Sequence, residues 1–453
     1  MIMDIKKNDD IELHIDNMTS EGAAVGHYGG VAVFVRGAVT GDDIIAHIIK
    51  TSKRYCIGIV KEIVNHSPHR IKSDCTASAK CGGCSFRNMT YAEELRFKRS
   101  RVEDAIKRIG HIDVPVNDVI GAEKIDGYRN KAQYPVSIND GELIAGFYAY
   151  KSHRIIPCAS CRLQPAEFEK CLAAFADWVE KSGVTSYDEN SGSGLLRHIY
   201  LRKTSTGEIM ACAVTNGEKL PQADLLIRNL TQIDGVKSIC QNVNTKNSNV
   251  ILGGTTKVLW GSESVTDVLL GKKFEISPNS FYQVNHDQCE KLYLKAAEYA
   301  DLTGDDVLCD IYCGAGTIGL TMADRAKQIY GIEIIPQAVE NARKNAKLNG
   351  IENAEYICGD AQYGAAELEK RGIRPDVAVL DPPRKGCSAE LLGTVCRMSP
   401  KRIVYVSCDP ATLARDLQIL SSSGYTALEA TPVDMFPRTP HIETVVVLHS
   451  RTK

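Results

Sequence analysis

Apolar and polar residues alternate along the first part of the chain with the period of two that is typical of strands. Alternation covers Asp10–Asp16, and further strand-like runs cover Val31–Val35, Ile44–Ile49 and Ile57–Ile63. Turns that contain glycine separate these runs, as in small antiparallel barrels. The pattern therefore predicts an N-terminal, OB-like β-barrel over residues 1–62.

The next part of the chain mixes one long helix with strands. Thr90 and Glu93 have the spacing of a capping box and Gly110 fits a C-terminal stop, which predicts a helix over residues 91–110. Strand-like runs follow at Lys131–Ile138, Ile199–Lys203, Ile209–Val214 and Val250–Leu252. We therefore expect a central α+β domain over residues 63–272, with its first helix packing on the following domain.

From about residue 302 the pattern changes to alternating strands and helices. The predicted strands are Val307–Ile311, Gln328–Ile334, Glu355–Cys358, Val377–Leu380, Ile403–Val406 and Thr444–Leu448. Continuous apolar runs separated by helices predict a parallel sheet that is covered on both faces. The third expected domain, residues 273–453, is therefore of the α/β, Rossmann-like type.

Composition adds limits to this picture. The 453 residues carry a net charge of −2 and include 16 cysteines. No apolar stretch is long enough to span a membrane, and the N-terminus lacks the apolar centre of a signal peptide, so we expect a cytoplasmic protein. In that reducing compartment the cysteines are ligands, nucleophiles or core residues, and not a disulfide framework. The balanced charge conceals a basic segment, because residues 63–110 hold ten Lys/Arg against five Asp/Glu.

The ends of the predicted strands indicate a nucleotide-like ligand. Asp310 is followed by a Gly314-Ala-Gly316 turn, Glu333 ends the second strand, and Asp360 follows the third. Glycines allow a ligand close to the backbone, and a carboxylate after the second strand can accept both ribose hydroxyls. A third glycine for a pyrophosphate is not cleanly supplied, which favours S-adenosylmethionine over NAD.

A possible nucleophile stands at the same edge. Asp381-Pro-Pro ends the fourth strand, and the next strand ends at Cys408, followed by Asp-Pro. A free cysteine is usually a core residue, but the position of Cys408 at a strand end beside Asp381 favours a thiol nucleophile. Glu443 stands in a His-x-Glu before a buried strand, and a glutamate taken alone is usually an exposed surface residue.

Together these motifs resemble those of the RNA (uracil-5-)-methyltransferases that carry an N-terminal TRAM domain and an iron–sulfur cluster. The resemblance rests on Phe281-Tyr-Gln-Val-Asn, Asp310-Ile-Tyr-Cys-Gly-Ala-Gly-Thr, Asp381-Pro-Pro-Arg-Lys-Gly, Val406-Ser-Cys-Asp-Pro-Ala-Thr-Leu-Ala-Arg-Asp and His441-Ile-Glu-Thr-Val-Val-Val-Leu. It implies that Cys408 is the nucleophile and Glu443 the base. It also implies that the S-adenosylmethionine positions include Gln283, Tyr312, Glu333 and Asp381, beside Asp310, Gly314 and Asp360 at the strand ends.

A cysteine motif supplies a second candidate site. Cys75-x5-Cys81-x2-Cys84 offers three thiolates, and four cysteines hold either zinc or a [4Fe-4S] cluster. Zinc is the first choice from spacing alone, whereas the resemblance implies [4Fe-4S]. The resemblance also points to Cys161 as the fourth ligand, with Cys158 left open as an alternative.

The resemblance implies an RNA substrate, and we expect the enzyme to be a monomer. The family members that methylate 23S ribosomal RNA combine a barrel with a cysteine cluster, so ribosomal RNA is expected, with transfer RNA as the alternative. A target uridine must leave its stack, and the basic helix 96–108, Tyr128–Lys131, Tyr134 and Phe281 are candidates to hold its surroundings. Two rival classes are adenine amino-methyltransferases, which lack a need for Cys408, and RNA-binding iron–sulfur proteins without catalysis.

Overall fold

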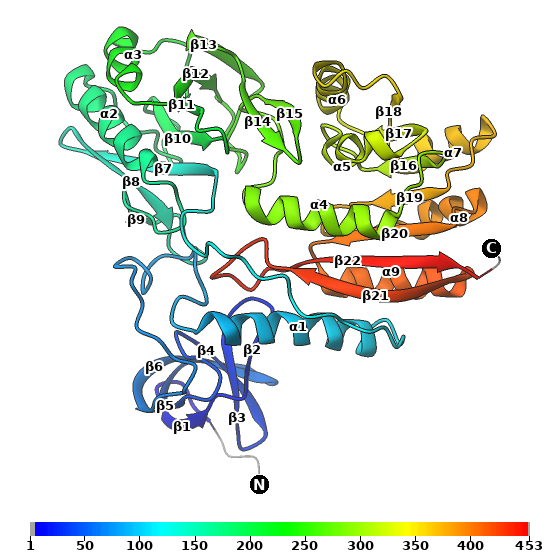
Figure 1. Cartoon of the computed structure of the whole chain (residues 1–453). Coiled ribbons are helices and arrows are strands. Elements are labelled where there is room, and N and C mark those ends of the chain that lie inside the picture. The colour runs from blue at the N-terminus through cyan, green and yellow to red at the C-terminus, as the bar shows by residue number, and fades with distance from the viewer. Residues whose placement is uncertain (1–4, 452–453) are drawn as a thin grey trace.

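The computed structural model describes residues 5–451, and within them the chain forms three sheets and a separate hairpin (Figure 1). The N-terminal sheet has six strands in the order β1-β5-β6-β4-β3-β2. Its strands are β1 (Asp10–His14), β2 (Asn17–Met18), β3 (Ala24–Tyr28), β4 (Val31–Arg36), β5 (Asp43–Thr51) and β6 (Tyr55–Asn65). The strands predicted in this region are confirmed, with limits that differ by a few residues.

The ends of this sheet approach one another and enclose an apolar core. The Asp16 N–H donates to the Val25 carbonyl at 2.9 Å, which joins the chain after β1 to β3. Alternate residues of β1 and β5 face inward, where Ile15, Val33 and Ile44 are fully buried. Period-two burial of this kind is what the alternating sequence predicts.

The central sheet has seven strands in the order β13-β12-β11-β10-β7-β8-β9, with two helices packed on it. The elements are β7 (Lys131–Asn139), β8 (Glu142–Tyr148), β9 (Ile155–Pro157), α2 (Glu167–Ser182), β10 (Leu196–Lys203), β11 (Ile209–Thr215), α3 (Ala223–Thr231), β12 (Val236–Val243) and β13 (Thr255–Gly261). The strand predicted at Val250–Leu252 is wrong. The Asn244 amide donates hydrogen bonds to the carbonyls of Val250 and Ile251, and Val250 is 64% exposed. The last strand of the sheet is therefore β13.

The C-terminal sheet has the order β18-β17-β16-β19-β20-β22-β21. Its elements are β16 (Val307–Ile311), α5 (Thr317–Thr321), the 3₁₀ helix η1 (Ala323–Arg325), β17 (Gln328–Glu333), α6 (Pro336–Leu348), β18 (Ala354–Cys358), α7 (Ala361–Lys370), β19 (Val377–Leu380), α8 (Ala389–Met398), β20 (Arg402–Ser407), α9 (Pro410–Ser422), β21 (Tyr425–Val433) and β22 (Glu443–Ser450). Before this sheet come a hairpin of β14 (Val265–Leu269) and β15 (Lys272–Ile276) and helix α4 (His286–Ala300).

One part of the prediction for this sheet is corrected. The first five strands are parallel, but β22 runs antiparallel to both β20 and β21. The apolar run of β22 reads the same in either direction, so the sequence pattern could not show its orientation. The sheet is therefore mixed, and the reversed strand brings Glu443 to the edge where β20 ends.

Helix α1 (Tyr91–Arg108) lies between the N-terminal sheet and strands β21 and β22 (Figure 1). Its Val102 and Ile106 belong to the same core as Ile311 of β16. The predicted capping box is wrong, because the Thr90 hydroxyl makes no capping hydrogen bond to the described residues and Glu93 instead binds Arg96. The basic face is also partly internal, since Lys98 is fully buried.

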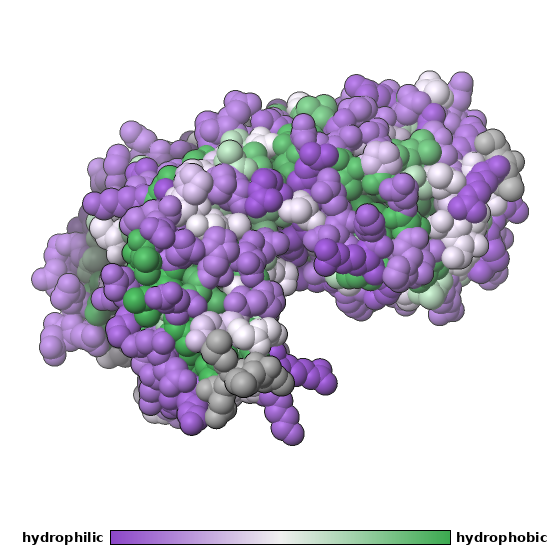
Figure 2. Space-filling view, turned by 90° about the horizontal axis from the view of Figure 1, so that it is seen from below, coloured by the Kyte–Doolittle hydropathy of each residue, from purple (hydrophilic) through white to green (hydrophobic). Residues whose placement is uncertain are grey.

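The described residues include no helix that is long and apolar enough to cross a membrane. The face of the molecule in Figure 2 is hydrophilic over most of its area, with smaller hydrophobic areas between the polar ones. This distribution agrees with the 24% of charged residues in the sequence.

Candidate active site

The turn after β16 is shaped by three residues in the left-handed region. Tyr312 has φ = 68°, Gly314 has φ = 56° and Gly316 has φ = 80°. A Cβ atom on Gly316 would lie 2.8 Å from the Tyr356 hydroxyl, so only glycine fits there. The turn therefore brings the backbone without large side chains to the carboxyl edge of the sheet, where a ligand can approach it closely.

Glu333 closes this turn from the neighbouring strand. One carboxylate oxygen accepts the Gly314 N–H at 3.1 Å, and the other accepts the Ile335 N–H at 2.8 Å. The two residues that follow, Ile334 and Ile335, were not predicted as site residues and are 60% and 57% exposed. Exposed apolar side chains beside a carboxylate offer an apolar surface on which an aromatic ring of a ligand can pack. Their position directly after a strand end is the sequence feature that could have identified them.

Asp310 and Asp360 both bind backbone in the structure. Asp310 is buried under the turn, where it accepts the Gly319 N–H at 2.8 Å with one oxygen and leaves the other unpaired among the described residues. Burial, with Glu333 nearby, raises the pKa of Asp310 to about 7. Asp360 caps α7 by accepting the Tyr363 N–H at 2.9 Å. Asp310 thus shapes the turn, and Asp360 stands at the edge of the same region.

Asp381 follows β19 and lies between the ligand turn and α4. Its N–H donates to the Ile311 carbonyl at 3.3 Å, and burial raises the pKa of its carboxyl to about 7, with Asp310 adding to the shift. The side chains of Cys289 and Tyr293 on α4 lie within electrostatic reach of Asp381. Gln283 stands shortly before α4, and its carbonyl accepts the Asn130 amide at 2.8 Å.

Strand register brings Cys408 and Glu443 together. β20 and β22 are antiparallel, and their last pair joins Ser407 to Thr444. Cys408 and Glu443 are the next residues beyond this pair, one on each strand end, and Glu443 acts electrostatically on the Cys408 thiol. Glu443 is 6% exposed and Cys408 is half-buried, so the thiol faces solvent more than the carboxyl does.

Burial and neighbouring negative charges oppose ionisation of the Cys408 thiol and of the Glu443 carboxyl. Burial, Glu443 and Asp381 raise the pKa of the Cys408 thiol to about 11. Burial and Asp381 hold the pKa of Glu443 well above its usual range. Arg384 opposes both shifts and also helps to lower the pKa of His441 to about 4. Cys408, Glu443 and Asp381 thus form a group of acids with Arg384 beside them, and their mutual repulsion favours a positively charged ligand near Asp381.

The predicted cysteine ligands surround a cavity of about 150 Å³. Its lining includes all five candidate cysteines, Cys75, Cys81, Cys84, Cys158 and Cys161. Burial raises the pKa of Cys84 to about 12, whereas hydrogen bonds from Cys158 and from the backbone lower the pKa of Cys161 to about 7. Even so, within residues 5–451 no group of three or more His, Cys, Asp or Glu side chains is placed to hold a metal ion.

Three cations stand together beside the junction of the central sheet and residues 277–285. Lys131 and Arg202 are cross-strand partners, and both Arg202 and Arg129 help burial to lower the pKa of Lys131 to about 8. None of the three forms an ion pair with a residue in the described part of the chain. Of the aromatic residues predicted to stack on RNA, Tyr128 and Tyr134 are buried, but Phe281 is 74% exposed.

Comparison with solved structures defines the class of the protein. The chain is similar to the tRNA (uracil-54, C5)-methyltransferase of Pyrococcus abyssi, solved in complex with S-adenosyl-L-homocysteine. The two are 27% identical with a TM-score of 0.78, and the match covers 97% of this chain and 100% of the other. The fold is that of an S-adenosylmethionine-dependent methyltransferase.

Sequence comparisons narrow the class to one family. The model of the tRNA (uracil-5-)-methyltransferases matches residues 254–451. Curated proteins named uncharacterized RNA methyltransferases are 45% identical in Clostridium tetani and 46% identical in Clostridium acetobutylicum. These matches cover 98% and 99% of this chain and 97% and 98% of the relatives. The chain belongs to the RNA (uracil-5-)-methyltransferase family.

Proposed function

We propose that the protein methylates C5 of a uridine in 23S ribosomal RNA through a covalent bond between Cys408 and C6 of the uracil. The observation that carries this proposal is the register of β20 and β22, which ends at Ser407–Thr444 and leaves Cys408 and Glu443 as neighbours at the ligand edge of the sheet. A nucleophile and a carboxylate side by side are what addition to C6 and removal of the C5 proton require.

The chemistry follows from the electronic structure of uracil. C5 is a weak nucleophile, and addition of the Cys408 thiolate to C6 turns C4–C5 into an enolate. When bound, S-adenosylmethionine would supply the methyl group that C5 attacks, with the methyl–sulfur bond breaking and S-adenosylhomocysteine as the leaving group. Glu443 removes the C5 proton, the electrons of that bond re-form C5–C6, and Cys408 leaves as the thiolate. The raised pKa of Glu443 suits a group that has to accept a proton.

The residues at the sheet edge fit S-adenosylmethionine. Glu333 can turn its carboxylate from the Gly314 N–H toward ribose hydroxyls, and Ile334 and Ile335 offer a surface for the adenine ring. Burial and, to a smaller extent, Asp310 raise the pKa of Asp381, and a sulfonium cation near this carboxyl would oppose both effects. We therefore assign cofactor contacts to Glu333 and Asp381 and, more peripherally, to Gln283, Tyr312 and Asp360, with Asp310 and Gly314 shaping the turn.

Replacing Glu333 should weaken cofactor binding. We expect Glu333→Gln to raise the Kd for S-adenosylhomocysteine by about 10- to 100-fold, because an amide offers a ribose one acceptor fewer and no charge. Isothermal titration calorimetry measures this Kd. Glu355→Gln is the matched control, since Glu355 stands on the neighbouring strand and pairs with Arg371. An unchanged Kd for Glu333→Gln would exclude this contact.

The alternative substrate is transfer RNA, and one comparison favours it. The archaeal enzyme named for transfer RNA matches over its full length. An N-terminal part ahead of the catalytic sheet therefore does not by itself distinguish the two substrates. We keep ribosomal RNA as the proposal because the resemblance joins the barrel and the cysteines to that substrate.

One experiment tests both the reaction and the substrate. The protein is incubated with S-adenosylmethionine and with either 23S ribosomal RNA or total transfer RNA transcribed with 5-fluorouridine. Fluorine at C5 blocks proton removal, so a protein–RNA adduct should persist with ribosomal RNA and survive denaturing electrophoresis. An adduct with transfer RNA alone would assign the alternative substrate. No adduct with either RNA would refute the mechanism.

We propose that Cys75, Cys81, Cys84 and Cys161 hold a [4Fe-4S] cluster in the 150 Å³ cavity. Five thiols around one cavity fit the donor set of such a cluster, which here would tie the loop after the barrel to the central sheet. Zinc is the less favoured occupant, and Cys158 would donate a hydrogen bond to Cys161 and not bind the cluster itself.

Replacing Cys161 and replacing Cys158 should have different effects on the iron content of the protein. In anaerobically purified protein, we expect Cys81→Ser and Cys161→Ser to lose most of the iron and the visible absorption band. Cys158→Ser should retain both, because it removes only a hydrogen-bond donor. Iron and zinc analysis by mass spectrometry measures this result. Equal loss for Cys158→Ser would make Cys158 a ligand, and zinc in place of iron would identify the other metal.

The proposal also covers the domain limits, the oligomeric state and the RNA-binding surface. We propose three domains, a TRAM barrel over residues 1–62, a central domain over 63–272 and the methyltransferase domain over 273–453, in a monomer that works in the cytoplasm. The hairpin of β14 and β15 spans the last of these limits. Arg129 and Lys131 are partly exposed and lack ion-pair partners within residues 5–451, so they are suited to RNA phosphates near the exposed Phe281. Arg202 is buried and binds the Tyr200 hydroxyl and the Ser280 carbonyl, so it supports Lys131 from inside the protein.

A further inference from the structure

The segment that delivers Glu443 to the site is a loop without regular structure. It connects β21 to β22 and covers residues 434–442, the β21–β22 loop. Its last residues, His441 and Ile442, lead directly into Glu443. A loop of this kind does not fix its own conformation, so contacts from other elements must decide where the base stands.

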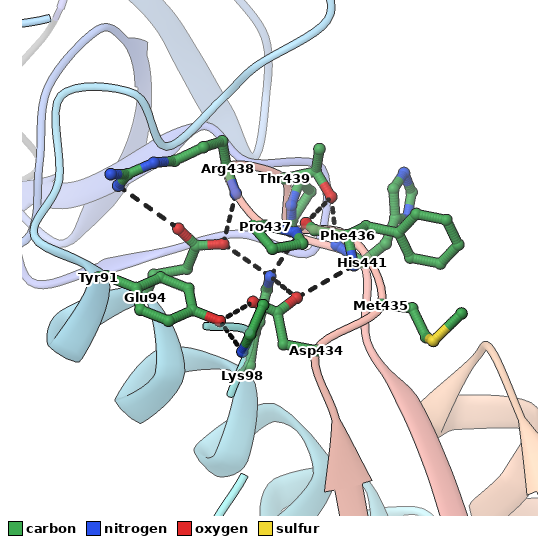
Figure 3. A network of polar contacts seen from close by, with 12 residues as sticks. Tyr91, Glu94, Lys98, Asp434, Met435, Phe436, Pro437, Arg438, Thr439 and His441 are labelled. Atoms are coloured by element: carbon green, nitrogen blue, oxygen red, sulfur yellow. Dashed lines mark hydrogen bonds and ion pairs between the residues drawn. The ribbon is translucent and has the colours of Figure 1, made fainter. Parts of the chain in front are cut away.

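The strongest of these contacts comes from α1. Lys98 is fully buried, and its ammonium donates to Glu94 at 2.7 Å, to Asp434 at 2.6 Å and to the Phe436 carbonyl at 3.2 Å (Figure 3). Asp434 also accepts the Phe436 N–H at 3.1 Å. One lysine thus binds both the side chain and the backbone at the start of the loop.

The two carboxylates beside Lys98 extend the same network. The Tyr91 hydroxyl donates to the second oxygen of Asp434 at 2.7 Å, and Glu94 accepts the Arg438 N–H at 2.7 Å (Figure 3). Arg438 in turn donates from its guanidinium to the Met89 carbonyl at 2.9 Å. Helix α1 therefore holds the β21–β22 loop at its beginning and at its middle.

Other contacts hold the loop but do not replace this network. The Gln288 amide of α4 donates to the Asp434 carbonyl at 3.0 Å, and the Asn285 amide donates to the Met435 carbonyl at 3.1 Å. Arg101 of α1 donates to the Pro440 carbonyl. These are bonds to backbone carbonyls, whereas Lys98 is the one cation in ion-pair contact with Asp434 within residues 5–451.

An ion network at this depth needs a reason other than stability. Removing an ammonium and two carboxylates from water is costly, and an apolar contact of similar volume would often hold the helix to the loop at least as well. Charged hydrogen bonds, however, select one geometry, because each donor must meet its acceptor. Such selection matters for a catalytic group, since a misplacement of about 1 Å can reduce a rate about 100-fold.

We propose that Lys98 is a positioning residue for the base: with Glu94, Asp434 and Tyr91 it fixes the β21–β22 loop so that Glu443 faces the C5 proton. This inference rests on the proposed function, because it assigns Glu443 that step. Lys98 acts through the loop and does not touch the uracil. Cys408 stands at the end of β20, so addition and methyl transfer depend less on the loop than proton removal does.

The test separates the steps of one turnover. In separate reactions, wild type or Lys98→Met is mixed, in excess over the RNA, with natural 23S ribosomal RNA fragments and radiolabelled S-adenosylmethionine. Samples are denatured at successive times. Label on RNA alone reports release, and label on a protein–RNA adduct reports an intermediate that has been methylated but not released. For Lys98→Met we expect release to slow about 10- to 100-fold while total label transferred changes only a few-fold. The adduct should therefore accumulate.

Matched variants exclude a merely structural effect. Arg99→Met removes the neighbouring cation of α1, whose ion pairs with Glu103 and Asp118 do not reach the loop, and it should show no adduct. Asp434→Asn keeps the size of the side chain and its acceptor oxygen, so it carries the test if Lys98→Met does not fold. Lys98→Arg should restore release in part.

Each outcome has one meaning. Adduct in Lys98→Met or Asp434→Asn, absent from Arg99→Met, supports the proposal. Equal loss of transfer and release, in proportion to the folded fraction seen by thermal unfolding, would overturn it and leave Lys98 a stabilising residue. If wild type transfers no label to the ribosomal RNA fragments while Lys98→Met is folded, the proposed function fails and not the positioning role alone.

Discussion

Replacing Cys408 by alanine should reduce methyl transfer to the background rate. Without the thiolate, C5 of uracil lacks the electron density to attack the sulfonium methyl group. Incorporation of radiolabel from S-adenosylmethionine into RNA measures the loss, which we expect to exceed about 10⁴-fold. Cys358→Ala is the matched control, because this exposed cysteine follows the same sheet edge and should be dispensable.

The pH dependence of wild type should report the same thiol. The pKa of Cys408 is raised to about 11, so the thiol is mostly protonated at neutral pH and the thiolate fraction grows as pH rises. Glu443 also has to be ionised before it accepts the C5 proton, and its raised pKa acts in the same direction. We expect kcat/KM to rise from about pH 6 to about pH 9. Substantial transfer by Cys408→Ala, or a rate that falls over this range, would contradict a thiolate mechanism.

Replacing Glu443 by glutamine should block the reaction at a later point. Glutamine cannot accept the C5 proton, so Cys408 cannot be eliminated and the methylated uridine stays bound to the protein. We expect turnover to fall by about 10²- to 10⁴-fold, with a covalent adduct on natural uridine that wild type does not accumulate. Denaturing electrophoresis after a single turnover measures this adduct.

The control for this variant uses another carboxylate close to the same strands. Glu429→Gln changes an acid on β21 that binds Asn117 and stands away from the sheet edge, and it should turn over normally. Failure of Glu443→Gln to transfer any methyl group would show that Glu443 acts before proton removal. Normal turnover would assign the base elsewhere.

The sequence predicted much of the site because strand ends are local features. A continuous apolar run followed by a turn residue marks where a buried strand leaves the sheet, and parallel strands share one carboxyl edge. Glu333, Asp381 and Cys408 could therefore be assigned to one edge from the order of residues alone. The predicted strand at Val250–Leu252 and the capping box of Thr90 were wrong because other side chains bind the groups that they require. The Asn244 amide binds the Val250 carbonyl, and Arg96 binds the Glu93 carboxylate.

The pattern of apolar and polar residues did not predict contacts between segments that are far apart in the sequence. A run of basic residues is usually a solvated face, and nothing in residues 96–108 distinguishes Lys98 from its neighbours. Its burial depends on Asp434, 336 residues further along the chain. In the same way the five cysteines could be counted but not placed, and the structure alone shows that Cys158 lines the same cavity as Cys161.

By itself the sequence determined the strand-and-turn order, the acids and the thiol that end the strands, and the family to which these motifs belong. Only the tertiary structure decided that β22 is reversed, that Cys408 and Glu443 therefore meet at one sheet edge, and that a buried lysine of α1 binds the loop before Glu443. The physical reason is the range of the interactions. Periodicity and turn chemistry act between near neighbours, whereas strand direction and a buried ion network are set by groups that meet only when the chain has folded.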